Sequence, residues 1–231
     1  MRDIIGLIGA MDEEIKLLLE GMENKETKVK AGIHYYIGNI LGKSVVLCKS
    51  GVGKVNAAVT TQILIDTFGV SRVLFTGVAG AVHPELNIGD IVISSTCVQH
   101  DMDATALGFS RGQIPYQENS VFQADPELVL LAEKACNDLG QKYLVGKVLS
   151  GDQFISNADI VAKLREELDG ACVEMEGAAV AQVCEMNATP FVIIRSMSDK
   201  SDGSANVSFK EFTEESSHRS HSILEFMLQH L

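Results

Sequence analysis

The chain has 231 residues, of which 46% are hydrophobic, and its formal net charge at pH 7 is −12. This apolar content suffices for one sizeable core, and the acidic balance disfavours binding to nucleic acid or to an anionic membrane surface. Five scattered cysteines without a CxxC pair argue against a zinc site or redox motif and favour a reduced, cytoplasmic protein. No apolar run reaches membrane-spanning length, and no stretch resembles a linker, so we expect a single domain over residues 1–231.

The first half of the chain alternates buried-strand patterns with helical patterns. Short apolar runs predict strands, and apolar residues recurring every three or four positions predict helices. In chain order we expect a strand at 4–8, a helix carrying Ile15, Leu18, Leu19 and Met22, a hairpin formed by 34–40 and 44–49, a helix at 55–68, and strands at 72–76 and 91–94.

The second half continues this alternation. Pro126 is expected to open a helix with Asp125 as its N-cap. After it we expect a strand at 145–149, a helix at 159–168, a strand at 172–175, a helix at 177–186, a strand at 191–195 and a helical tail at 209–231. This order predicts an α/β fold, a three-layer αβα arrangement around a central mixed sheet, with functional groups just after the strands.

Three glycine-rich segments follow predicted strands: Gly9–Met11, Ser50–Lys54 and Thr76–Gly80. The second fails as a P-loop, because Cys48 and Val55 occupy positions that need Gly and Ser or Thr, and it also fails as a dinucleotide fingerprint. Each could be only a tight strand-to-helix turn. Three in one α/β chain favour close approach of the backbone to a ligand.

Carboxylates stand out near three predicted strand ends. Glu14 could be an ordinary acidic residue of a helix start, as Asp12 and Glu13 are interpreted, or a site residue. Glu174 and Glu176 interrupt the end of an apolar strand; residues two apart on a strand face the same way, so this pair could accept hydrogen bonds from a sugar diol. Asp199 is expected on a loop after a strand, where it could be an N-cap or a functional group.

Six segments in order along nearly the whole chain resemble the nucleoside phosphorylase and nucleosidase superfamily, and within it the 5′-methylthioadenosine/S-adenosylhomocysteine nucleosidase family. The resemblance implies a nucleoside phosphorylase-like fold and hydrolysis of the N-glycosidic bond of these nucleosides and of 5′-deoxyadenosine, without metal or cofactor. The segments are 8–14, 49–54, 76–80, 150–155, 173–179 and 195–199.

The resemblance also implies roles for individual residues. It implies that Glu14 activates the attacking water with Arg195 nearby, that Glu176 binds the ribose hydroxyls, and that Asp199 protonates N7 of the leaving adenine. The remaining implied substrate contacts are Met11, Val52, Val78, Ala79, Gly80, Phe154 stacked on adenine, the Ile155 backbone at its edge, Glu174, the Met175 backbone, Ser198 beside Asp199, and Phe209.

Members of this family are homodimers in which a partner segment closes the site, here 107–115 with Leu107, Phe109 and Pro115. The apolar segment 99–116 is therefore expected to be buried in a symmetric homodimer. Two departures concern the details. Val78 stands where a hydroxyl residue is common, which Thr76 could replace, and Leu107 stands where an aromatic is common, for which Phe109 could compensate.

Two other functions compete with hydrolysis. A phosphate-dependent purine nucleoside phosphorylase needs cationic or N–H donors for phosphate, whereas Glu14 would repel it and the segment 76–80 contains no Arg. A nucleoside-binding sensor would need no catalytic carboxylates. The resemblance places the hydrolase in methionine salvage and in the removal of methyltransferase by-products.

Overall fold

The computed structural model describes residues 3–201 and 205–231. Within them ten strands form one sheet. The strands are β1 (Ile4–Gly9), β2 (Glu23–Lys30), β3 (Ile33–Ile40), β4 (Lys43–Lys49), β5 (Arg72–Ala81), β6 (Ile91–Gln99), β7 (Phe122–Gln123), β8 (Tyr143–Ser150), β9 (Gly170–Glu174) and β10 (Phe191–Asp199). The helices are α1 (Asp12–Glu20), α2 (Lys54–Phe68), the 3-10 turn η1 (Thr105–Leu107), α3 (Pro126–Asp138), α4 (Ala158–Leu168), α5 (Gly177–Met186) and α6 (Ala205–His230).

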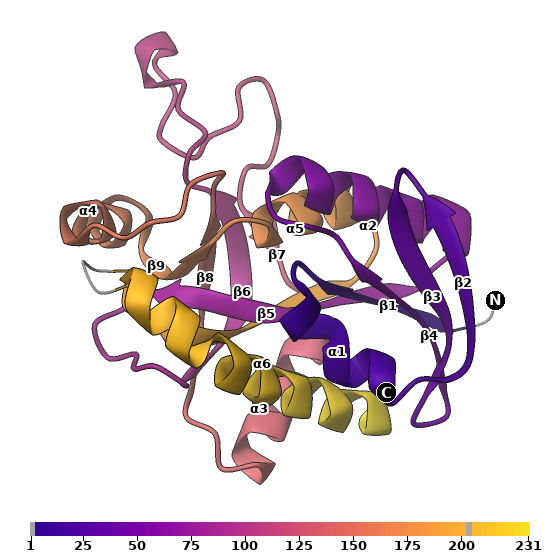
Figure 1. The fold of residues 1–231 in the computed structure, drawn as a ribbon. Helices are drawn as coiled ribbons and strands as arrows, with labels where there is room; N and C mark the ends of the chain where they lie inside the picture. Colours follow the sequence, from indigo (N-terminus) through magenta and orange to yellow (C-terminus); the bar gives the residue numbers. More distant parts are fainter. Residues whose placement is uncertain (1–2, 202–204) are drawn as a thin grey trace.

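The sheet is mixed and partly closes on itself. Its order is β10-β6-β8-β9-β5-β1-β4-β3-β2, with β7 paired to β6, and β10 pairs a second time with β5. Strands β10, β6, β8, β9 and β5 are therefore joined in a ring, from which the other strands extend (Figure 1). The expected mixed sheet is confirmed, whereas the ring depends on long-range pairings that sequence periodicity does not report.

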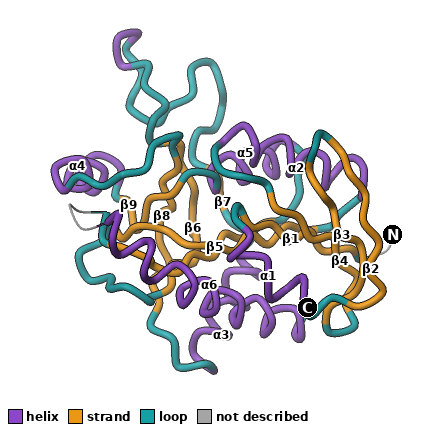
Figure 2. Tube along the Cα trace, viewed as in Figure 1, coloured by secondary structure: helices purple, strands orange, loops and turns teal. Residues whose placement is uncertain are grey.

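Helices cover both faces of the sheet, as expected for three layers. One apolar cluster joins the sheet to α2 and α5 through Leu64 and Val180, and a second joins it to α1, α3 and α6 through Leu18, Leu128 and Leu224. Figure 2 shows these two groups of helices on opposite sides of the strands. The N-cap at Asp125 is confirmed, because its side chain accepts from Leu128 N at 3.0 Å.

Two local expectations were wrong, and one strand was not expected at all. Thr76–Gly80 is not a turn, because β5 continues through Ala81 and pairs with β10 and β9. Asp199 is not on a loop but is the last residue of β10. Strand β2 was not expected, because its eight residues are all exposed and largely charged, and therefore carry no apolar alternation.

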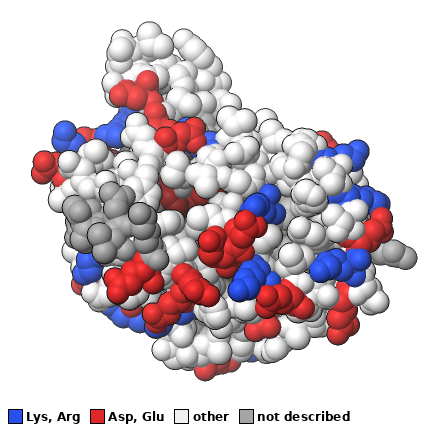
Figure 3. Space-filling view, viewed as in Figure 1, with Lys and Arg blue, Asp and Glu red and all other residues white. Residues whose placement is uncertain are grey.

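A long segment between β6 and β7, residues 100–121, projects from the body of the protein; we call it the arm. Its tip carries η1, and Figure 1 shows it standing clear of the sheet and helices. In Figure 3 its outer surface is mostly uncharged. Leu107 and Tyr116 are 70% and 91% exposed and are not covered within this chain, whereas Ile114 and Met102 of the same arm pack against the chain's own core.

Candidate active site

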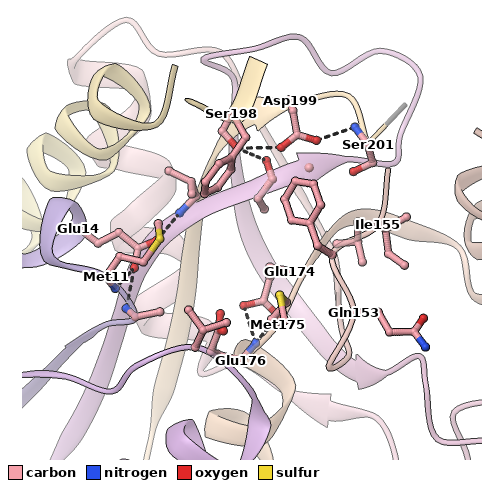
Figure 4. A pocket seen from close by; sticks show the side chains of 18 residues that line it. Met11, Glu14, Gln153, Ile155, Glu174, Met175, Glu176, Ser198, Asp199 and Ser201 are labelled. Carbon is pink, nitrogen blue, oxygen red and sulfur yellow. Dashed lines mark hydrogen bonds between the residues drawn. The ribbon is translucent and has the colours of Figure 1, made fainter. Parts of the chain in front are cut away.

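One pocket of about 290 Å³ opens where several strands end (Figure 4). This volume is close to the range of small-molecule sites. Its wall is formed by the segment after β1, the loop before α2, the last residues of β5 and β10, the segments after β8 and β9, and the first part of α6. The pocket thus lies at strand ends, where functional groups are expected in this fold.

Glu14 enters the pocket from the first turn of α1 and is 5% exposed. Its Oε2 accepts from the backbone N–H groups of Ala10 at 2.6 Å and Met11 at 3.0 Å, and its Oε1 accepts from Val78 N at 3.0 Å. Burial raises the pKa of Glu14, against the opposing charge of Arg195. The structure thus holds a carboxylate of increased basicity in one orientation by three backbone donors.

Arg195 lies directly behind Glu14 and Gly77 and is 1% exposed. A Cβ at Gly77 would overlap Glu14 Oε1 and lie 2.6 Å from Arg195 Nη1. The Arg195 guanidinium also stacks on the ring of Phe75 at 3.9 Å. Position 77 therefore needs a glycine, because the side chains of Glu14 and Arg195 approach its Cα closely. The position of Gly77 within β5 gives no sign of this requirement.

Glu174 holds Arg195 from the other side. Its Oε2 accepts from Arg195 Nη2 at 2.5 Å and Nε at 3.2 Å, and its carboxylate also accepts from Gly177 N and from the Ser150 hydroxyl. Both side chains are almost fully buried. Although Glu174 lines the pocket, its hydrogen bonds are directed to the protein, and it anchors the start of α5 and the guanidinium.

Glu176 follows two residues later but not on the strand, which ends at Glu174. The expectation that both carboxylates converge as strand neighbours was therefore wrong: Glu176 is the N-cap of α5, and its Oε1 accepts from Gly53 N at 2.8 Å. Burial, and after it the charge of Glu174, raises the pKa of Glu176 to about 8. Both carboxylates nevertheless line the same pocket, one from the end of β9 and the other from the N-cap of α5.

Asp199 reaches the pocket from the end of β10 and is 2% exposed. Its Oδ2 accepts from the Ser198 hydroxyl at 2.9 Å, and its Oδ1 accepts from Ser201 N at 2.7 Å (Figure 4). A register shift between Met197 and Asp199 occurs in the pairing with β5. Ser201 adopts a positive φ of 52°, a strained conformation that places its N–H on the carboxylate.

Two aromatic rings lie at the mouth of the pocket. Phe154, 45% exposed, and Phe209 of α6 meet edge to face with centroids 5.6 Å apart. Val52, 50% exposed, lies on the loop before α2. These side chains offer flat apolar surface beside the carboxylates, which suits a ligand with an aromatic ring and polar hydroxyls.

Most of the sequence-predicted site residues line this pocket. Arg195 lies behind its wall, and Leu107, Phe109 and Pro115 are on the arm. Thr76 is fully buried outside the lining, so the structure does not bring its hydroxyl to the place of the missing Val78 hydroxyl. The predicted residues in the lining are Met11, Glu14, Val52, Val78, Ala79, Gly80, Phe154, Ile155, Glu174, Met175, Glu176, Ser198, Asp199 and Phe209.

Four lining residues were not predicted: Ala10, Gln153, Val173 and Ser201. Ala10, Gln153 and Val173 lie within the resembling segments 8–14, 150–155 and 173–179, next to predicted residues, so the signal for them was already in the sequence. Ser201 carries no sequence signal, because its contribution is a backbone conformation. Over residues 3–201 and 205–231, no three His, Cys, Asp or Glu side chains are grouped as metal ligands. Nor does any described helix have the length and hydropathy needed to cross a membrane.

Comparison with known proteins connects this geometry to a family. The model of the phosphorylase superfamily matches residues 4–229. A 5′-methylthioadenosine/S-adenosylhomocysteine nucleosidase from Pseudoalteromonas translucida is 42% identical, over 98% of this chain and 97% of its own. The Neisseria meningitidis nucleosidase of that name, solved with methylthio-immucillin-A, superimposes with a TM-score of 0.95 at 38% identity, covering 99% of this chain and 100% of its own. Helicobacter pylori futalosine hydrolase has a TM-score of 0.95 at 36% identity, over 99% and 98%.

Proposed function

The chain belongs to the 5′-methylthioadenosine/S-adenosylhomocysteine nucleosidase family of the phosphorylase superfamily, and from this we propose that it hydrolyses the N-glycosidic bond of these two nucleosides. The products are adenine and the corresponding 5-thioribose, and 5′-deoxyadenosine is a further substrate. The observation that carries the proposal is one pocket in which three buried carboxylates, Glu14, Glu176 and Asp199, arrive from three different elements.

Cleavage of this bond creates positive charge on the sugar and negative charge on the leaving base, as in other glycosidic hydrolysis. Asp199 is proposed to protonate N7 of adenine, because a neutral base leaves more easily than an anion. The Ser198 hydroxyl and Ser201 N–H hold both oxygens of Asp199 in place. Phe154 and Phe209 support this assignment by providing aromatic surface near it for the purine ring.

Glu14 is proposed to orient and deprotonate the attacking water. Oε1 accepts only one backbone N–H and so keeps acceptor capacity for a water molecule, whereas Oε2 already accepts two. A raised pKa makes it a better proton acceptor than an exposed carboxylate. Arg195 lies behind the wall of the pocket and remains paired with Glu174. Its Nη1 has no hydrogen-bond partner among the described residues and lies on the side of Gly77 where Glu14 is found.

Glu176 is proposed to accept hydrogen bonds from the ribose hydroxyls, with the Met175 backbone beside it. Its Oε1 is oriented by Gly53 N. Among the described residues no N–H or O–H donates to its Oε2, unlike Glu174, whose two oxygens both accept hydrogen bonds from the protein. The negative charge of an ionised Glu176 also favours the cationic sugar of the transition state. Met11 and Val52 add apolar contact on the same pocket.

Phosphorolysis is disfavoured by the electrostatics of this pocket. A phosphate nucleophile needs cationic or N–H donors, yet the nearest guanidinium is neutralised by Glu174 and the backbone N–H groups at this position already serve Glu14. Adenine release from methylthioadenosine, measured with and without phosphate, tests both alternatives. Phosphate-dependent release would establish a phosphorylase, and no release would favour a nucleoside sensor. Parallel assays with S-adenosylhomocysteine, 5′-deoxyadenosine and futalosine define which 5′ group is accepted.

We further propose a homodimer in which the arm of one copy covers the 5′ end of the other copy's pocket. Leu107 is largely exposed, and the ring of Phe109 meets that of Tyr116 edge to face, at a centroid distance of 5.5 Å. These apolar groups are suited to a second copy. We also propose a cytoplasmic location, because all five cysteines are buried free thiols and the substrates are small intracellular nucleosides.

A further inference from the structure

Three polar side chains meet where the arm leaves β6, and we call Lys54, Asp101 and Asp152 the arm junction. Lys54 Nζ donates to Asp101 Oδ1 at 2.7 Å, and Asp101 Oδ2 accepts from Asp152 N at 3.0 Å. Asp152 Oδ1 in turn accepts from Lys54 N at 2.8 Å. The first residue of α2, the start of the arm and the segment after β8 are therefore joined in one closed set of hydrogen bonds.

The arm junction stands one residue from a contact of the pocket. Gly53, the N-cap of α2, donates its N–H to Glu176, and its φ of 99° lies in the left-handed region. A Cβ at Gly53 would lie 3.1 Å from Asp152 Oδ1, so Asp152 packs against this glycine as well. Glycine is the most mobile of residues unless its neighbours are held. The direction of the Gly53 N–H thus depends on what anchors Lys54.

The Lys54–Asp101 pair is more than a surface contact. Their side chains are 18% and 19% exposed, which limits screening by water and salt. Burial alone would raise the pKa of Asp101, but the hydrogen bonds from Lys54 and from Asp152 N outweigh it, and the pKa of Asp101 is lowered. Asp101 is therefore held ionised, as the anchor for the Lys54 ammonium.

The arm also contacts α5, the helix that Glu176 caps. Gln99, at the end of β6, donates from its Nε2 to Gln182 Oε1 at 2.6 Å, and Gln182 Nε2 lies 3.3 Å from Oε1 of Gln117, near the arm's far end. Lys54 Nζ bonds to Gln99 Oε1 at 3.1 Å. The two ends of the arm are thereby tied to the first residue of α2 and to the middle of α5.

We propose that the arm junction is a positioning site: Asp101 and Lys54 hold the Gly53 N–H on Glu176 and so link the placement of the arm to the orientation of the ribose-binding carboxylate. The ribose role of Glu176 rests on the proposed function; the link between Asp101 and Gly53 does not. Because the same contacts anchor the start of the arm, a displacement of the arm is expected to displace the Gly53 N–H and with it Glu176.

Steady-state kinetics on methylthioadenosine test the link with the variants Asp101→Asn, Lys54→Met and their combination. Either single change should reduce kcat/KM about 10- to 100-fold, mainly through KM, since a hydrogen bond to a charged group is weakened. The double variant should be no worse than the poorer single, because both remove one interaction. Lys54→Arg should keep most of the activity. Lys142→Met, which breaks a pair with Asp90 outside the pocket, is the matched control and should behave as wild type.

The pH profile separates positioning from general damage. The Gly53 N–H lowers the pKa of Glu176 against burial, so Asp101→Asn should move the acidic limb of kcat/KM to higher pH. An unmoved limb, a loss confined to kcat, or additive effects in the double variant would overturn the proposal.

Hydrogen exchange without any nucleoside keeps the two proposals apart. Mass-spectrometric exchange over residues 51–56 should be faster in Asp101→Asn and Lys54→Met than in wild type and Lys142→Met. Equal exchange in all four proteins would overturn the positioning role. If wild type releases no adenine but exchange still accelerates in the variants, the proposed function fails while the link from the arm to Gly53 stands.

Discussion

Two regions of the molecule differ in how completely one chain satisfies their side chains. One is the arm, and the other is the set of buried charged residues at the pocket, Glu14, Glu174, Glu176, Arg195 and Asp199, which we call the floor. On the floor, Glu14, Glu174 and Arg195 are between 1% and 7% exposed and are held by backbone or side-chain partners. On the arm, Leu107 and Tyr116 are mostly exposed. The difference is what we expect if, as proposed, bond cleavage is preorganised within one chain while a second copy completes the contact with the 5′ group.

The largest effect is expected from removing the proposed acid of the floor, Asp199. Asp199→Asn should bind methylthioadenosine but lose roughly 10²–10⁴ in kcat, about 3–5 kcal/mol of barrier, because Asn cannot transfer a proton to N7. Rapid-quench adenine release together with equilibrium binding measures this. The defect should shrink for a nitrophenyl thioriboside, whose leaving group departs without protonation. An equal loss on both substrates would remove Asp199 as the acid.

Glu14→Gln should cause a loss of similar size, roughly 10²–10⁴, but on both kinds of substrate, because water is needed whichever group leaves. Binding of the nucleoside should be nearly intact, since the base and ribose contacts remain. The comparison of the two variants on the two substrates thus assigns acid and base separately. Wild-type turnover by Glu14→Gln would exclude it as the water-activating group.

A smaller effect is expected from crowding the floor without changing any charge. Gly77→Ala would place a methyl group against Glu14 Oε1 and Arg195 Nη1. We expect kcat to fall about 10- to 100-fold and unfolding to become easier by about 1–3 kcal/mol, as for overpacked cores. Gly21→Ala is the control, since its Cβ would meet nothing closer than 3.5 Å at an ordinary φ. Denaturant titration and kinetics of both variants make the measurement.

On the arm, Leu107→Asp should leave the fold of the monomer unchanged, because Leu107 is 70% exposed. It should weaken the dimer and raise KM for methylthioadenosine by about 10-fold, with a smaller change in kcat. Sedimentation at micromolar concentration and steady-state kinetics report the two effects. A wild-type mass of one chain at that concentration would contradict the proposed dimer.

The most gradual effect is a pH dependence of stability that originates at Glu176. The pKa of Glu176 is raised to about 8, so the folded protein holds a proton that the unfolded chain has released above about pH 4.5. Its contribution to stability is therefore full below about pH 4.5 and is lost as pH rises towards 8, with a slope of at most about 1.4 kcal/mol per pH unit. Melting curves of Glu176→Gln should lose this part of the slope, while those of Leu107→Asp should keep it.

The sequence by itself determined the alternation of strands and helices, since burial on a sheet or one helix face dictates apolar spacing. It also indicated the strand ends as the place of the site, and the resemblance selected the residues that line it. The exposed strand β2 was not predicted, because a charged edge strand carries no apolar period. The extension of β5 through Thr76–Gly80 was not predicted either. Its glycines were interpreted as a turn, but glycine also occurs within a strand where other side chains approach the backbone closely.

Only the tertiary structure decided how the carboxylates differ. Glu174 and Glu176 are alike in sequence, yet one is fully engaged with Arg195 and the start of α5, while the other receives the Gly53 N–H and stays available to the pocket. The arm junction likewise unites residues about 50 positions apart in sequence, which no local pattern reports. The physical reason is that burial, charge neighbours and hydrogen-bond partners come from long-range pairing of strands, whereas sequence spacing reports only what one element turns toward the core.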